Sequence, residues 1–253
     1  MQLHRFYLPP PDCREDRLRL EGREAHHALR VLRLKERDEA SVLDGAGNDF
    51  FCDVENTTRD SLTLRVKKKT STPPLPCSIT LFVGIPKGKI IESIIQKAVE
   101  LGAVKIAPLL TERVVTKLDE EGSENRREQW QQVAIEAMKQ CGTAWLPEVQ
   151  SPASVKHFLS KKDKFDLQLV GSLQKERRHP QEVFREYEKT NGYPPRSVAL
   201  WVGPEGDFTP GELEATQNAG AHPISLGRLV LRVETAAIYC LSMLNYEFNS
   251  QDK

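Results

Sequence analysis

Residues 77–253 alternate short apolar runs with segments of helical periodicity, and this alternation constrains the fold more than any other feature of the chain. Continuous apolar strands are typical of a sheet covered on both faces, and strands separated by helices usually pair in parallel. The sequence therefore predicts an α/β domain with a mostly parallel sheet. The expected strands are 79–83, 104–108, 167–170, 198–202 and 223–226, and the expected helices are 90–99, 130–141, 180–189, one that opens at 209–212, and 234–248.

The first 70 residues have a different character, with short alternating runs typical of half-buried strands. A small closed β-barrel is the expected fold, because closure leaves no long unpaired strand edges. Residues 67–76 hold three lysines and three prolines, which predicts a linker between a domain at 1–70 and a domain at 77–253. The expected strands are 17–21, 39–44, 49–55 and 61–66, with a short helix at 24–33 and a turn at 45–48.

Composition excludes several classes of protein. Lys and Arg number 36, as do Asp and Glu, so the zero net charge excludes a protein that coats nucleic acid through bulk charge. No apolar run approaches the roughly 18 residues of a membrane helix, and no signal core follows Met1. The five cysteines lie at least 25 positions apart, which fits neither a disulfide framework nor a zinc motif. We expect a reduced, cytoplasmic, metal-free protein without a membrane segment.

Two motifs that invite a functional interpretation fail on inspection. The segment Gly84 to Lys89 resembles a phosphate loop, but it is one residue too short between its glycines and ends without a hydroxyl for magnesium. His26 and His27 have no third ligand nearby in sequence, so a zinc site is not expected there.

Three segments of the second domain share one pattern, since each follows an apolar strand and contains glycine. They are residues 170–172, 202–208 and 226–235. Ligands of open α/β sheets bind at the carboxyl ends of the strands, and glycine lets the backbone approach a ligand closely. Taken one at a time, each segment also fits an ordinary strand-to-helix turn.

Several motifs together resemble a known family. Gly203-Pro204-Glu205-Gly206 with Phe208, Leu226-Gly227, and the run 231–236 are similar to the knotted SPOUT methyltransferases. The chain resembles most closely the ribosomal RNA small subunit methyltransferase E family, whose members methylate N3 of a specific uridine in 16S rRNA. The similarity spans almost the whole chain in the right order, through residues 26–33, 44–47, 96–97, 100–102, 111–113, 136–142 and 147–148.

The resemblance implies an N-terminal PUA-like barrel that binds RNA and a C-terminal domain with a deep trefoil knot. It also implies S-adenosylmethionine in the knot, 16S rRNA or the small ribosomal subunit as partner, and a homodimer. The last helix is apolar nearly all round, which fits burial or an interface equally well, and the resemblance favours the interface. The cofactor residues carried over are Val170, Gly171, Val202, Gly203, Glu205, Gly206, Leu226, Gly227 and Leu231.

The implied reaction moves a methyl group to a nitrogen that must first lose a weakly acidic proton. Arg232 is the candidate to orient the base or stabilise its oxygens, because a guanidinium stays charged and presents a fixed fork of donors. Glu234 is the candidate proton acceptor, although a carboxylate at a helix N-terminus also serves as a cap. Glu205 fits a role in bracing its loop.

Basic residues near the N-terminus are the RNA candidates. Arg5 precedes two aromatic residues, and Arg30 and Arg33 begin a basic run that continues to residue 37. Arg113, after a predicted strand, is a further candidate for the cleft. Charge runs of this kind are also common on solvated faces.

The chain departs from the family pattern at three positions. Asp207 stands where a second glycine is usual, Thr143 where arginine is usual, and Leu229 where arginine is frequent, with Arg228 one place earlier. We expect these departures to affect which nucleotide is modified more than whether the cofactor binds. The alternatives are a SPOUT enzyme that modifies another atom, such as a ribose hydroxyl, and a non-catalytic RNA-binding protein.

Overall fold

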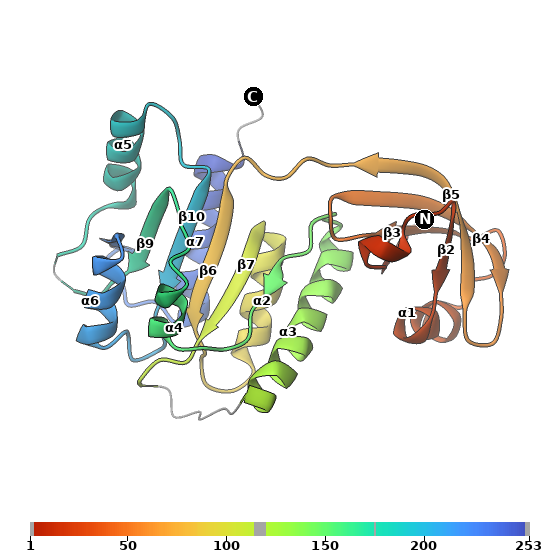
Figure 1. The fold of residues 1–253 in the computed structure, drawn as a ribbon, viewed down its shortest axis with the longest axis horizontal. Helices are drawn as coiled ribbons and strands as arrows, with labels where there is room; N and C mark the ends of the chain where they lie inside the picture. Colours follow the sequence, from red (N-terminus) through yellow and green to blue (C-terminus); the bar gives the residue numbers. More distant parts are fainter. Residues whose placement is uncertain (1–2, 114–119, 175, 251–253) are drawn as a thin grey trace. The chain divides into compact units, whose positions relative to one another are not determined.

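The computed structural model describes residues 3–113, 120–174 and 176–250. The chain forms two compact units. The first contains residues 1–74 together with 135–146, and the second contains residues 75–134 together with 147–253. Figure 1 shows the ribbon coloured along the sequence.

The first unit is built on a five-stranded sheet in the order β1-β3-β4-β5-β2. β1 pairs with β3 in parallel and the other neighbours pair antiparallel. β1 and β2 are the two end strands of this sheet in the described residues, so closure into a barrel stays a prediction. The elements are β1 (His4–Tyr7), the 3-10 turn Pro10–Asp12, β2 (Arg17–Leu20), α1 (Gly22–His26) continued by a π-helical turn (His27–Val31), β3 (Glu39–Leu43), β4 (Asn48–Thr57) and β5 (Leu62–Ser71).

β5 is longer than the sequence predicts. Residues 67–71, expected in the linker, continue the strand and pair with the start of β4, where Ser71 is opposite Asn48. Lys69 lies 5.2 Å from the centre of the Phe50 ring, and Lys67 pairs with Asp53 at 2.6 Å, so both lysines make contacts within the sheet.

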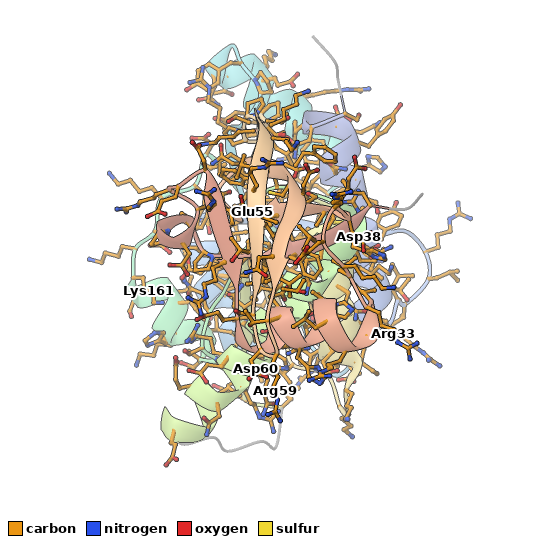
Figure 2. All side chains as sticks on the ribbon, turned by 90° about the vertical axis from the view of Figure 1, so that its right-hand side faces the viewer. Arg33, Asp38, Glu55, Arg59, Asp60 and Lys161 are labelled. Carbon is orange, nitrogen blue, oxygen red and sulfur yellow. The ribbon has the colours of Figure 1, made fainter. Side chains whose placement is uncertain are left out.

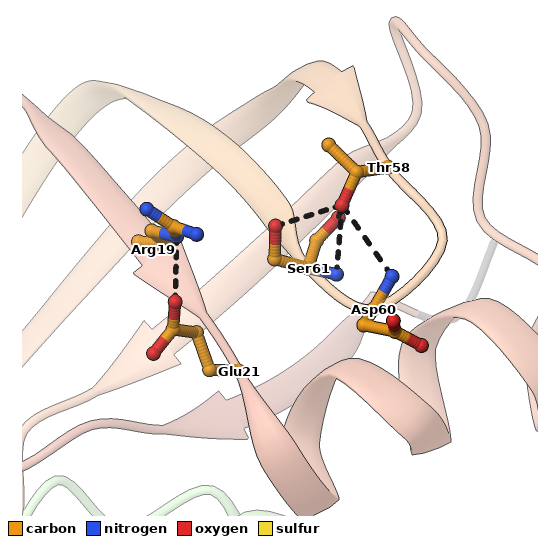
Figure 3. Close-up of polar contacts among 5 residues, drawn as sticks. All are labelled: Arg19, Glu21, Thr58, Asp60 and Ser61. Atoms are coloured by element: carbon orange, nitrogen blue, oxygen red, sulfur yellow. Dashed lines mark hydrogen bonds and ion pairs between the residues drawn. The ribbon is translucent and has the colours of Figure 1, made fainter.

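The turn between β4 and β5 is held by one hydroxyl. Thr58 Oγ1 accepts hydrogen bonds from the backbone N–H groups of Ser61 at 3.1 Å and Asp60 at 3.4 Å, as Figure 3 shows. The turn between β3 and β4, predicted at residues 45–48, is confirmed. There the buried Asp44 Oδ1 accepts from the N–H groups of Ala46 and Asn48.

The end of α3 (Glu120–Cys141) belongs to the first unit through buried polar contacts. The Lys139 ammonium lies 2.7 Å from a carboxylate oxygen of Glu24, and the Lys139 side chain is only 6% exposed. The Arg5 guanidinium donates to the main-chain oxygens of Lys139 and Gln140. These partners lie more than 100 positions apart in sequence, so periodicity along the chain could not predict the arrangement.

The second unit contains a six-stranded sheet in the order β11-β9-β10-β6-β7-β8. Every pairing between these strands is parallel, which confirms the predicted sheet. The strands are β6 (Ser78–Gly84), β7 (Ala103–Leu109), β8 (Glu148–Val149), β9 (Leu167–Gly171), β10 (Ser197–Val202) and β11 (Ala221–Ile224). β11 lies two residues before its predicted position, and β1 and β8 were not predicted.

Helices cover both faces of this sheet. In Figure 1, α4 (Val155–Ser160) lies in front of the sheet and α7 (Val233–Phe248) behind it. Phe82 and Trp201 stack with 3.9 Å between ring centres and share a core with Phe158 of α4 and Leu213 of α6 (Pro210–Asn218). The remaining helices are α2 (Ile90–Glu100), which packs on α7, and α5 (Pro180–Asn191).

A local signal in the sequence places the start of α6 where it is predicted. Thr209 and Glu212 form a complete capping box at the start of α6, with Pro210 in the first turn. α7 begins at Val233, one residue before its predicted start. Among the helices that the structure describes, none combines the length and apolarity of a membrane-spanning helix.

Candidate functional site

A cavity opens at the carboxyl ends of β9, β10 and β11 in the second unit, where the three glycine-containing segments meet. Its space not filled by protein atoms, open mouth included, is about 580 Å³. The lining residues are Gly171, Ser172, Leu173, Arg177, Val202, Gly203, Pro204, Glu205, Asp207, Leu226, Gly227, Leu229, Val230, Leu231, Val233 and Ala236.

The loop after β10 turns tightly, and a side chain at its first residue would be closely packed. A Cβ atom on Gly203 would lie 3.1 Å from the Phe208 nitrogen and 3.2 Å from Asp207 Oδ1. Asp207 has a φ of +61°, in the left-handed region, and its Oδ1 accepts a hydrogen bond from the Phe208 N–H at 2.8 Å. Asp is one of the few residues other than glycine that visit this region, which accounts for its tolerance here. The loop therefore brings its backbone and two acidic residues, Glu205 and Asp207, to the cavity lining.

Neighbouring loops brace this segment from outside the cavity. Glu205 Oε1 accepts a hydrogen bond from the Lys87 N–H at 3.1 Å, in the loop after β6. The Arg113 guanidinium, after β7, donates to the main-chain oxygens of Gly206 and Asp207. The role expected for Glu205 in bracing its loop agrees with this contact. A cavity wall held in this way is pre-organised for a ligand.

The far end of the same loop is fixed at the start of α6. Glu212 is 8% exposed, and its carboxylate accepts hydrogen bonds from the N–H groups of Glu112 at 3.0 Å and Thr209 at 2.9 Å. One buried carboxylate thus ties the segment after β7 to the loop after β10.

The loop after β11 offers its backbone to the cavity. Gly227 has a φ of +105°, and its N–H donates to Ser225 Oγ at 3.3 Å. In the described chain, the main-chain groups of residues 228–231 make no hydrogen bond with protein. Leu229 and Val230 are 77% and 76% exposed, which is unusual for apolar side chains at a cavity mouth. These groups are available to a ligand or a partner surface.

Seven of the nine predicted cofactor residues line the cavity. They are Gly171, Val202, Gly203, Glu205, Leu226, Gly227 and Leu231. Val170 instead has a fully buried side chain in the core beside Trp201, because alternate residues of a strand face opposite sides of the sheet. Gly206 is exposed and contacts Arg113 rather than the cavity.

The two catalytic candidates lie just beyond the cavity lining. Arg232 is the exposed N-cap residue of α7, and Glu234 is half-buried in the first turn of that helix. Their neighbours Leu231 and Val233 both line the cavity. Arginine is a poor N-cap residue, because its side chain cannot accept a hydrogen bond from the free N–H groups of the first turn. Helix stability therefore does not explain why an arginine occupies the N-cap position of α7.

The four RNA candidates have different surroundings. Arg30 and Arg33 are exposed on the first unit, and Figure 2 labels Arg33 among its surface side chains. Arg5 is half-buried against the end of α3, and Arg113 clamps the loop after β10. Arg30 and Arg33 are thus the two of the four whose positions leave them open to a large partner.

Sequence reasoning did not identify Arg177 as a cavity residue. It follows the short glycine segment at 170–172 by several positions, where no pattern distinguishes it from surface arginines. Asp207 and Leu229, noted only as departures from a family pattern, also line the cavity.

The buried cysteines provide no nucleophile. Burial raises the pKa of the Cys77 and Cys240 thiols to about 12 and that of Cys13 to about 11. Cys52, whose pKa burial also raises to about 12, lies in the core of the first unit. These thiols stay neutral at physiological pH, and none of the five cysteines, all within the described residues, lines the cavity.

Comparison with known proteins gives matches over nearly the whole chain. The RNA methyltransferase domain family matches residues 73–245, and the RNA methyltransferase PUA domain family matches residues 20–67. The chain is 31% identical to ribosomal RNA small subunit methyltransferase E of Synechocystis over 96% of its own length and 77% of that protein. It is also 31% identical to the Bacillus subtilis protein of the same name, over 89% and 88% of the two chains.

A solved structure shares the fold over nearly the whole chain. The ribosomal RNA small subunit methyltransferase E of Neisseria gonorrhoeae, solved bound to S-adenosyl methionine, superposes with a TM-score of 0.86 at 26% identity. The match covers 98% of each chain. The chain therefore has an α/β fold with a parallel sheet and a PUA-like domain.

Proposed function

This chain belongs to the ribosomal RNA small subunit methyltransferase E family, and on that premise we propose that it methylates N3 of a specific uridine in the 16S rRNA of the small ribosomal subunit. The methyl donor is S-adenosylmethionine. The observation that carries the proposal is the cavity at the carboxyl ends of three parallel strands, walled by all three glycine-containing loops. Ligands of open parallel sheets bind at this end of the strands.

The cavity suits the cofactor chemically. The free main-chain groups of residues 228–231 match the polar edge of an adenine, and the apolar side chains of Leu226, Val202 and Ala236 match its faces. Gly203 lines the cavity with backbone alone. When bound, S-adenosylmethionine supplies an electrophilic methyl group on a positively charged sulfur.

The chain's own residues must position the uridine and remove its N3 proton. Arg232, at the edge of the cavity, holds the base through its oxygens and stabilises the negative charge left on them. Glu234, two residues further along α7, accepts the proton or caps that helix. The increase in reaction rate comes from alignment of the uridine with the methyl group and from charge stabilisation, since no covalent enzyme intermediate is required.

The order of strands supports the knot. α7 follows β11 at one end of the sheet, yet it packs on α2 and β6, so the chain must cross back past β9 and β10. We assign that crossing to a trefoil knot. We also assign the exposed Tyr239 and Tyr246 of α7, together with Leu229 and Val230, to a homodimer interface.

RNA recognition belongs to the N-terminal unit. Residues 1–70 form the PUA-like RNA-binding part, residues 77–253 form the methyltransferase part, and Arg30 and Arg33 contact phosphates. The enzyme works in the cytoplasm, where small subunits are assembled.

Calorimetry tests the cofactor step. Wild-type protein is titrated with S-adenosylmethionine, and so is a Gly203→Trp variant, whose side chain would meet Phe208 and Asp207 and displace the loop that walls the cavity. Saturable binding by the wild type and none by a still-folded variant support the proposal. Equal binding by both proteins would contradict the placement of the cofactor in this cavity.

A further inference from the structure

We propose that Arg177 recognises the carboxylate at the methionine end of the cofactor, an assignment that rests on the proposed use of S-adenosylmethionine in this cavity. Arg177 is the only positively charged side chain among the lining residues, all of which lie in the described chain. The two negatively charged lining residues are Glu205 and Asp207.

The segment that carries Arg177 is anchored at both ends to β11 and the residue after it. At its start, the Ser172 N–H donates to the Ile224 oxygen at 3.1 Å. At its end, the Arg178 N–H donates to the Pro223 oxygen at 3.0 Å, and the Arg178 oxygen accepts from the Ser225 N–H at 2.9 Å. Since β11 leads directly into the third cavity loop, this anchoring fixes the position of Arg177 relative to the cavity wall.

The Arg177 guanidinium has unused hydrogen-bonding capacity. Its Nη1 donates to the Ser172 oxygen at 3.3 Å, and within the described residues it forms no ion pair. A guanidinium carries five N–H donors in a planar fork that matches a carboxylate bidentately. An arginine with most donors free at a cavity wall is therefore suited to an anionic ligand group.

The adjacent arginine shows the contrast. Arg178 lies 2.5 Å from the Glu186 carboxylate on α5, so its charge is already paired within the protein. Arg177, one position earlier, lines the cavity without a carboxylate partner in the described chain. Two neighbouring arginines thus have different roles, one in the fold and one toward a ligand.

The charges of the cavity mirror those of the cofactor. S-adenosylmethionine carries two positive groups, the sulfonium and the ammonium, and one carboxylate. The lining has one positive side chain and two negative ones. With the cofactor carboxylate on Arg177, the sulfonium and the ammonium of the cofactor have Glu205 and Asp207 as partners of opposite charge.

The test pairs a change in the protein with a change in the ligand. Full-length wild type, Arg177→Gln and Arg178→Gln are titrated with S-adenosylmethionine and with its decarboxylated form, which keeps the adenosine, sulfonium and ammonium. Charged hydrogen bonds to a carboxylate are strong, so Arg177→Gln should weaken S-adenosylmethionine binding by roughly tenfold or more and decarboxylated binding by less than about twofold. The matched control Arg178→Gln should bind both ligands as the wild type does.

Each other outcome has a clear meaning. If Arg177→Gln weakens both ligands equally, or neither, the assignment is wrong. Should Arg177→Gln fail to fold, Arg177→Lys replaces it, with a loss that is smaller but still confined to the carboxylate-bearing ligand. If wild-type protein that is folded binds neither ligand, the proposed function itself fails, and the assignment fails with it.

Discussion

Gly84 lies at the end of β6, outside the cavity lining, yet its substitution should damage the proposed cofactor site. A Cβ atom at this position would lie 2.5 Å from the Pro204 nitrogen and 2.8 Å from Pro204 Cδ. Contacts below 3.0 Å do not occur for real Cβ atoms, so Gly84→Ala must separate the two segments by about 0.5 Å or more. Pro204 belongs to the loop that walls the cavity.

The expected magnitude follows from that displacement. Overpacking of this kind costs about 1–3 kcal/mol, and a protein of this size loses roughly 2–4 °C in Tm for each kcal/mol. Binding sites tolerate shifts of only about 0.5 Å, so we expect S-adenosylmethionine affinity to fall by roughly tenfold. Thermal unfolding and calorimetry measure the two effects on the same sample.

Gly211→Ala is the matched control. Gly211 lies in the first turn of α6 without a left-handed backbone, and a Cβ atom added there would meet nothing within 4 Å. The change should leave binding intact and hold or slightly raise Tm, because alanine favours a helix. Wild-type affinity and Tm in Gly84→Ala would refute the argument that contact with β6 holds the cavity loop in place.

Other predictions concern stability and reactivity. Asp207→Gly removes a left-handed non-glycine residue and should raise stability by about 1 kcal/mol, measured by denaturant unfolding. Lys139→Met leaves the nearly buried Glu24 carboxylate without its cation and should cost about 3 kcal/mol, whereas Arg17→Ala, which breaks a solvent-exposed pair, should cost far less. Iodoacetamide at pH 8 should modify the exposed Cys141 and spare the four buried thiols, as mass spectrometry of the native protein would show.

The outcomes that contradict these predictions are equally specific. A loss of stability in Asp207→Gly would mean that the bond from the Phe208 N–H outweighs backbone strain. Equal costs for Lys139→Met and Arg17→Ala would mean that burial of the first pair is unimportant. Faster modification of the buried cysteines than of Cys141 would contradict the described core.

The raised thiol pKa values also predict a pH effect. Burial raises the pKa of Cys240 to about 12 in the fold, against 9.0 for the ordinary thiol. Above about pH 9 the unfolded chain loses protons that the folded chain keeps, so stability should decline from there towards pH 12. Cys240→Ala should flatten this alkaline decline in urea unfolding measured between about pH 8 and pH 11. If stability declines with pH as steeply in Cys240→Ala as in the wild type, the prediction is wrong.

The elements of the second unit could be predicted because local pattern and burial agree there. Apolar runs such as β6 and β10 are covered on both faces, and Thr209 with Glu212 marks a helix start by its own side-chain chemistry. The cavity loops could be predicted for a related reason, since glycine after a strand marks a close turn at the ligand-binding end of the sheet.

What could not be predicted depends on contacts between distant parts of the chain. The end of α3 belongs to the first unit because Lys139 meets Glu24 and Arg5 meets the last main-chain oxygens of the helix. Arg177 lines the cavity because β11 holds its loop, and no local pattern carries that information. The side chain of Val170 lies in the core, because alternate residues of a strand face opposite sides of the sheet, and its role toward the cofactor stays a prediction.

The central claim is a methyl group on N3 of uridine, and nucleoside mass spectrometry tests it most directly. Small ribosomal subunits and naked 16S rRNA that lack the modification are incubated with the protein and isotope-labelled S-adenosylmethionine, then digested to nucleosides. We predict labelled 3-methyluridine at one site, absent when Gly203→Trp replaces the wild type. Label on another nucleoside or on a ribose would contradict the assignment of the target atom, and no label on either substrate would favour an RNA-binding protein without catalysis.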